Sequence, residues 1–208
     1  MKWHRFTLLV ALLGLAAVAL AQSEASKTAA QSDPHGHNAV AASAPKTDAP
    51  KSDSQRSFET VKSLAGTWSA KVTMDPPVPS MKSNGPSEVT MRVTSRGNAL
   101  VHEMYELGVP DDPTRYDHPV TMLYLDGDQL SLVHYCDAGN RPHMVARPSA
   151  DGKTVEFDFV DISGPLKYGH MHHAVFTVID ENHHTEDWTY MLPGDKAMHA
   201  HFDLQRKQ

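Results

Sequence analysis

From Gly66 to the C-terminus, apolar and polar residues alternate in short runs, and this pattern limits the fold more than any other feature of the chain. The first two runs alternate through Trp68, Ala70, Val72 and Met74 and through Val89, Met91 and Val93. A period of two is typical of strands, because successive side chains point to opposite faces. Further extended runs cover about 99–107, 119–125, 129–136, 142–148, 154–160, 170–179, 184–191 and 197–205. The sequence therefore predicts an all-β domain of about ten strands.

Tight-turn signals separate most of these runs. They are Arg96-Gly97-Asn98, Asp126-Gly127-Asp128, Ala138-Gly139-Asn140, Asp151-Gly152-Lys153, Asp180-Glu181-Asn182 and Pro193-Gly194-Asp195. Such residues in short gaps join antiparallel neighbours. We therefore expect an antiparallel meander that closes into a barrel, because closure removes both exposed edges. A two-sheet sandwich is the structural alternative.

The N-terminus is typical of an export signal. Lys2, His4 and Arg5 form a basic region, residues 6–20 form an apolar run, and Ala19-Leu20-Ala21 matches a signal-peptidase site. The run is short for a membrane span of about 20 residues. We expect a signal peptide at 1–21 and a periplasmic or secreted protein, with a retained N-terminal anchor as the alternative.

The next segment, 22–56, is rich in Ala, Ser and Pro and has almost no large apolar side chains, which predicts a disordered tether. It contains His35 and His37, which could bind a metal ion. A short helix should follow, with Ser54 or Ser57 as its cap and Gly66 at its end. The predicted barrel domain covers 57–208.

Charge and cysteine content narrow the classes of partner. Loss of Lys2 and Arg5 with the signal peptide changes the formal net charge from −6 to −8. An acidic exported chain is a poor candidate for binding nucleic acid. After signal cleavage we expect no stable insertion into a membrane. Cys136 is the only cysteine, so no intramolecular disulfide can form.

The meander places many histidines at one end of the barrel, which we call the mouth. Neighbouring strands run in opposite directions, so the end of one strand lies beside the start of the next. By this rule His102, His183 and His184 do not lie at the mouth. The mouth collects His118, His134, His143, His170, His172, His173, His199 and His201, together with Cys136.

Alternation predicts which of these side chains point inward. His134 shares the parity of Leu130 and Leu132, and His170 and His172 share that of Phe176, so all three should face the interior. His173, His199 and His201 should face solvent. The inward set predicts a metal site formed by His134, His170 and His172, for example for Zn²⁺. The alternative is a polar rim, or a pocket for an organic ligand.

Other residues join the predicted ligand site. His143 and Arg141 lie beside the mouth, and Arg141 could hold an anionic group. Trp188 and Tyr190 share the parity of Glu186, which lies nearer the far end and is therefore a weaker candidate ligand. Cys136 beside His134 could be a nucleophile, although a single cysteine is more often a buried apolar residue.

Several motifs resemble known barrels. Leu64-Ala65-Gly66-Thr67-Trp68-Ser69 resembles the Gly-x-Trp opening of lipocalin-like proteins. Residues 122–130 (MLYLDGDQL), 134–142 (HYCDAGNRP), 169–172 (GHMH) and 186–189 (EDWT) resemble exported bacterial lipocalin-like proteins of unknown function, of the DUF1579 type. The resemblance covers about residues 57–208. It implies that Trp68 plugs one barrel end and that Arg206 packs on it by a cation–π contact.

A more distant resemblance is to nitrobindin-type haem barrels, and it implies His170 or His172 as an axial ligand. The sequence contains no phosphate loop, dinucleotide fingerprint or serine-centred elbow, so it favours a binding protein over an enzyme. We expect a small-molecule-binding barrel with a histidine-rich mouth. A metal- or haem-dependent protein, whether an enzyme or not, is the first alternative, and an inert envelope or interaction protein with a filled barrel is the second. The sequence leaves the oligomeric state open.

Overall fold

The computed structural model describes residues 50–77, 87–110, 112 and 114–208. This part of the chain forms a closed antiparallel barrel of ten strands, so the predicted barrel is confirmed and the sandwich alternative is wrong. The predicted signal peptide and most of the predicted tether lie outside the described residues. Among the described residues, no helix has both the length and the apolar character that a membrane span requires.

One helix, α1 (Asp53–Ser63), precedes the barrel. A short 3₁₀ turn, η1 (Ser95–Gly97), joins the second and third strands. The strands are β1 (Gly66–Asp75), β2 (Ser87–Thr94), β3 (Ala99–Glu106), β4 (Val120–Asp126), β5 (Gln129–Tyr135), β6 (Arg141–Pro148), β7 (Thr154–Ser163), β8 (His170–Asp180), β9 (His183–Leu192) and β10 (Lys196–Arg206).

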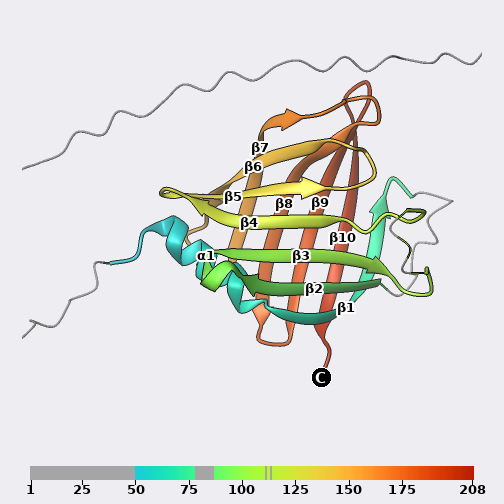
Figure 1. The fold of residues 1–208 in the computed structure, drawn as a ribbon. Coiled ribbons are helices and arrows are strands. Elements are labelled where there is room, and N and C mark those ends of the chain that lie inside the picture. Colours follow the sequence, from blue (N-terminus) through green and yellow to red (C-terminus); the bar gives the residue numbers. More distant parts are fainter. Residues whose placement is uncertain (1–49, 78–86, 111, 113) are drawn as a thin grey trace, which may run out of the picture. The chain divides into compact units, whose positions relative to one another are not determined.

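Each strand pairs with its neighbour in the chain, and β1 pairs with β10 to close the barrel. Trp68 marks the closure, because it lies opposite Val89 of β2 on one side and Arg206 of β10 on the other. Figure 1 shows β2–β5 crossing in front of β8–β10, with α1 at one end. The mouth is the opposite end, where β1, β3, β5, β7 and β9 end.

The helix begins earlier than the sequence pattern suggested. Ser52 is its N-cap: the Ser52 hydroxyl accepts a hydrogen bond from the Gln55 amide at 3.2 Å, and the Gln55 side chain accepts one from the Ser52 amide at 2.9 Å. This capping box satisfies two amides that a helix start leaves unpaired. The expected caps Ser54 and Ser57 are therefore wrong; both lie inside the helix and are buried. α1 thus starts inside the range 22–56.

The end of the barrel near α1 is closed. α1 packs against β4–β7 and buries Phe58 and Val61. Trp68 is fully buried there; its indole N–H donates to the Leu64 carbonyl at 2.9 Å, and the Arg206 guanidinium lies 4.1 Å from its ring centroid. The Arg206 guanidinium also donates hydrogen bonds to backbone carbonyls, so the cation–π contact holds the Trp68 ring in place at this end.

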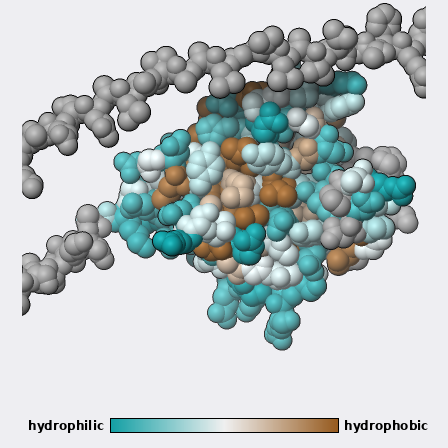
Figure 2. Space-filling model, in the orientation of Figure 1, coloured by the Kyte–Doolittle hydropathy of each residue, from teal (hydrophilic) through white to brown (hydrophobic). Residues whose placement is uncertain are grey.

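The interior near this end is filled by apolar side chains, including Leu100, Leu123, Leu132, Met144 and Phe157, all with no exposed surface. On the outside, cross-strand neighbours form a second apolar row through Val101, Met122 and Val133. Figure 2 shows apolar residues over the strands in view, bordered by hydrophilic ones.

Candidate functional site

A cluster of polar side chains lies in the barrel interior, among the apolar core. Its centre is Glu186 of β9, which is fully buried. The other members are His184 and Trp188 of β9, His102 of β3, and His134 with Thr121 from β5 and β4, and all of them are buried. We call these six residues the interior polar cluster. They share the inward parity of their strands, which is why side chains from four strands meet.

The Glu186 carboxylate accepts hydrogen bonds from three residues. His102 Nε2 lies 3.1 and 3.0 Å from its two oxygens, His184 Nε2 lies 3.1 Å from Oε1, and Trp188 Nε1 donates to Oε2 at 2.9 Å. The ring of His184 also meets Trp68 edge-on, with 4.2 Å between centroids. The cluster is therefore linked to the plug at the closed end.

Glu186 is held as a carboxylate. Burial acts to raise its pKa, but the charge and hydrogen bond of His102, followed by those of His184, outweigh burial and lower the pKa below its ordinary value. Because both imidazoles use Nε2 for Glu186, their other nitrogens need partners elsewhere. Within the described part of the chain, Nδ1 of His102 and Nδ1 of His184 are buried and have no hydrogen-bond partner.

His134 is the third buried histidine of the cluster. Its Nδ1 lies 2.8 Å from the Thr121 hydroxyl, and its ring lies 5.7 Å from that of Trp188. Burial, and then the nearby charge of His102, lowers the pKa of His134 to about 3. The imidazole is therefore neutral at neutral pH and can either donate or accept one further hydrogen bond.

The predicted metal ligands are not brought together. In the described part of the chain, two groups of three potential ligand atoms lie within 4.8 Å of one another: Asp117 with Cys136 and Asp137, and Glu156 with Asp158 and His173. Neither group contains His134, His170 or His172. His134 belongs to the interior polar cluster instead, and only His170 and His172 meet.

A β-bulge is the reason that simple alternation fails here. Met171 pairs with Tyr190 and His173 with Thr189, so His172 has no partner on β9 and the parity changes at this point. Met171, the residue between the two histidines, packs against the core. His170 and His172 are half-buried, and burial followed by the charge of His172 lowers the pKa of His170.

The remaining predicted ligand residues are dispersed. His143 Nδ1 lies 3.4 Å from the Asp161 carboxylate, and Arg141 Nε donates to the Ser163 hydroxyl at 3.0 Å. The Tyr190 hydroxyl donates to the Tyr168 carbonyl at 3.0 Å, and burial raises its pKa to about 12. Of this set, Trp188 alone belongs to the interior polar cluster.

The outward histidines have partners on the barrel surface. His199 is exposed and lies 3.0 Å from the Thr189 hydroxyl, and His201 is exposed and lies 2.6 Å from the Asp187 carboxylate. His173 Nε2 lies 2.9 Å from Glu156, which also accepts from Arg147 at 2.7 Å. The group of Glu156, Asp158 and His173 is therefore an ion-pair network in which Arg147 competes with any metal ion.

Cys136 is not activated as a nucleophile. Burial is the main cause of its raised pKa, and the charges of Asp117 and Asp137 add to it, whereas an attacking thiol needs a lowered one. It lies beside a surface cavity of about 400 Å³ lined by residues 114–118 and 135–137. This arrangement gives no support to catalysis by Cys136.

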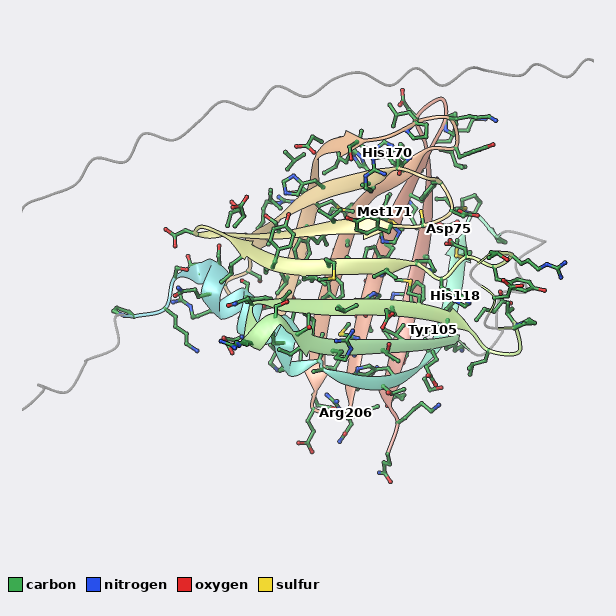
Figure 3. The ribbon with its side chains drawn as sticks, in the orientation of Figure 1. Asp75, Tyr105, His118, His170, Met171 and Arg206 are labelled. Carbon is green, nitrogen blue, oxygen red and sulfur yellow. The ribbon has the colours of Figure 1, made fainter. Side chains whose placement is uncertain are left out.

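Partly buried apolar side chains surround the core beside the interior polar cluster and between it and the mouth. Val72, Met104, Met171 and Ala200 are partly buried and pack against the core from strands around the barrel. Figure 3 shows Asp75, Tyr105 and His118 at this end and Arg206 near the opposite one. The interior polar cluster lies deeper in the barrel than Met104 and Met171, because His102 precedes Met104 along β3 and Trp188 precedes Tyr190, the partner of Met171, along β9. Ala200 pairs with Trp188, and Val72 pairs with Phe202, the partner of Glu186, so these two residues lie beside the cluster.

Sequence reasoning missed His102 and His184 as site residues. The available signal was parity. His184, Glu186 and Trp188 occupy every second position of β9, and His102 lies two residues from both Leu100 and Met104, so each set shares one face of its strand. Three polar residues with inward parity on one strand, His-x-Glu-x-Trp, indicate a buried polar group. That His102 reaches Glu186 across the barrel is not visible in the sequence.

Comparison with known proteins supports the fold. No family model and no curated protein matches the chain. Among solved structures, it is similar to Rv2717c from M. tuberculosis, with 13% identity over 73% of this chain and 98% of that one and a TM-score of 0.51. A protein of unknown function from the DUF3598 family of Nostoc punctiforme PCC 73102 gives 10% identity over 71% of this chain and 48% of that one, with a TM-score of 0.36.

At these identities the likeness to Rv2717c concerns the barrel fold alone, and the second likeness carries no argument. The resemblances to DUF1579-type proteins and to nitrobindin stay predictions.

Proposed function

We propose that the protein is an exported barrel that binds a small, largely apolar and uncharged molecule through its mouth. The observation that carries the proposal is the interior polar cluster, which has Met104 and Met171 between it and the mouth and Val72 and Ala200 beside it. Ligand sites of this type combine an apolar lining with a few placed polar groups. A buried ion pair is rarely the most stable way to fill a core, so recognition of a ligand gives the cluster a reason to exist.

The charge of the cluster favours an uncharged ligand. Glu186 is its only carboxylate, and the buried residues of the described chain include no Lys or Arg. The carboxylate of Glu186 is already bonded to His102, His184 and Trp188. A charged head group buried beside the cluster would therefore lose its hydration without gaining a counter-ion, which is costly.

The polar end of the ligand is therefore a hydroxyl or carbonyl group. Neutral His134 can donate to it or accept from it, and Nδ1 of His102 and Nδ1 of His184 are further candidate partners. A hydroxyl suits such a set, because it is both donor and acceptor. We infer binding rather than a reaction, since a neutral base, a fully bonded carboxylate and a thiol of raised pKa do not form an activated nucleophile.

The test uses three probes with one skeleton: 1-pyrenebutanol, 1-pyrenebutyrate and 1-pyrenebutylamine. Fluorescence titration of the purified protein should give the alcohol at least tenfold tighter binding than the carboxylate. Ala200→Trp, which places a large ring beside Trp188 of the interior polar cluster, should abolish binding. The matched control His201→Trp changes the next residue on the outer face and should leave binding unchanged. Absence of binding by every probe, or equal loss in both variants, would show that the mouth is not a ligand site.

A metal- or haem-dependent protein is the second candidate. The observation that favours a metal ion is the close approach of His170 and His172. Within the described residues, no contact favours haem over a simple ion.

Export is a separate proposal. It is supported by the sequence of residues 1–21, and N-terminal sequencing of the protein recovered from a bacterial periplasm or medium should begin at Gln22.

A further inference from the structure

Two imidazoles at the mouth approach each other more closely than their strand positions alone would bring them. Nε2 of His170 and Nδ1 of His172 are 3.1 Å apart, with the ring planes at 71°. The cause is the bulge at His172, since an unpaired residue can turn its side chain toward a neighbour. Figure 3 shows His170 beside Met171 on β8.

Packing holds both rings in place. The ring of Phe159 on β7 lies 4.7 Å from that of His170 and 5.1 Å from that of His172, and the second contact is stacked. The backbone before His170 is also fixed, because the Asn140 amide donates to the Gly169 carbonyl at 2.7 Å and to the Pro165 carbonyl at 2.8 Å. The pair is therefore ordered by its surroundings as well as by its own contact.

Gly169 makes this placement possible. Its φ of +96° suits glycine, and a Cβ at this position would collide with the Met191 carbonyl of β9. The chain can therefore enter β8 close against β9, with His170 as the first residue of the strand.

We propose that His170 and His172 form a two-imidazole binding site for a borderline divalent cation such as Zn²⁺ or Cu²⁺. Two imidazole nitrogens on a tetrahedral Zn²⁺, each about 2.0–2.1 Å from the ion, are about 3.3 Å apart, close to the observed separation. Two protein ligands leave the other positions of the ion open to water or to a small ligand. Cu²⁺ should bind more tightly than Zn²⁺, as the usual affinity order requires.

The chain supplies a matched control. His199 and His201 have the same i, i+2 spacing on β10, which pairs with β9 without a bulge, and they face Thr189 and Asp187 respectively. If spacing alone created a site, this second pair would bind as well. The site depends instead on the bulge and on Phe159, which only the first pair has.

The experiment is a titration of the purified protein with ZnCl₂ by calorimetry and with CuCl₂ by electron paramagnetic resonance. His35→Ala and His37→Ala are present in every variant, because that segment could bind the ion independently. We expect one ion per chain, and at least tenfold weaker binding after His170→Ala or His172→Ala. His199→Ala and His201→Ala should leave the affinity unchanged. Equal weakening by both pairs, or none by His170→Ala and His172→Ala, would overturn the proposal.

A measurement on the parent chain guards against variants that misfold. In ¹⁵N-resolved NMR spectra, one equivalent of Zn²⁺ should shift the imidazole signals of His170 and His172 and leave those of His199 and His201 in place. Shifts confined to other histidines would refute the site. Because the pyrene probes require no metal, this proposal and the ligand-binding proposal can fail independently.

Discussion

The buried, neutral state of His134 makes the fold sensitive to mild acid. In the unfolded chain this histidine should titrate near its ordinary pKa of 6.5, whereas in the folded protein its pKa is lowered to about 3. As the pH falls below 6.5, the unfolded state therefore binds a proton that the folded state does not. Stability contributed by the neutral imidazole is present above pH 6.5 and is lost progressively toward pH 3.

The size of the loss follows from the two pKa values. Each pH unit between them costs about 1.4 kcal/mol, so lowering the pH from 7 to 5 should remove about 2 kcal/mol of unfolding free energy through His134 alone. Glu186 does not interfere, because its unfolded pKa is near 4.5 and its contribution is lost only at lower pH. A loss of this size is a large part of a typical stability of about 5–15 kcal/mol.

The assay is urea unfolding of the parent protein and of His134→Gln at pH 7 and pH 5. The glutamine keeps a polar partner for Thr121 but does not titrate, so the drop between the two pH values should be about 2 kcal/mol smaller in the variant. His199→Gln, an exposed histidine, is the control and should retain the parent drop. The same pH dependence in His134→Gln and in the parent would refute the reasoning, even if the variant were less stable at both pH values.

Two further predictions concern the buried charges. Glu186→Ala should destabilise the fold by about 3–5 kcal/mol in urea unfolding at pH 7, because it leaves buried N–H donors without their acceptor. Asp187→Ala, on the outer face, is the control and should lower the unfolding free energy by about 1 kcal/mol or less. Similar losses in the two variants would contradict a buried network around Glu186. Arg206→Ala should cost about 2–4 kcal/mol, since the cation–π contact and charged hydrogen bonds are both lost. Arg206→Lys should recover part of this, and the near-ultraviolet signal of Trp68 should change in parallel; an unchanged signal in Arg206→Ala would argue against the contact.

Local chemistry determined the strands. Alternation and turn residues placed the observed strands within a few residues of their expected ranges, for example Gln129–Tyr135 against 129–136. Both features act between residues that are near in sequence, so the sequence contains them directly. The same holds for the inward position of His134 on a regular strand. The N-cap at Ser52 was missed because several nearby serines offer the same chemistry.

Tertiary structure alone decided which polar groups meet. His102 and Glu186 lie on β3 and β9, which are not neighbours, and they touch only because the closed barrel brings opposite walls together. The stagger of strands around a barrel sets such contacts, and no local pattern reports it. The bulge at His172 is a second example: one extra residue shifts the pairing of β8 with β9 and accompanies the close approach of His170 and His172. Side-chain parity is local and therefore predictable, whereas registry across the barrel depends on the whole chain.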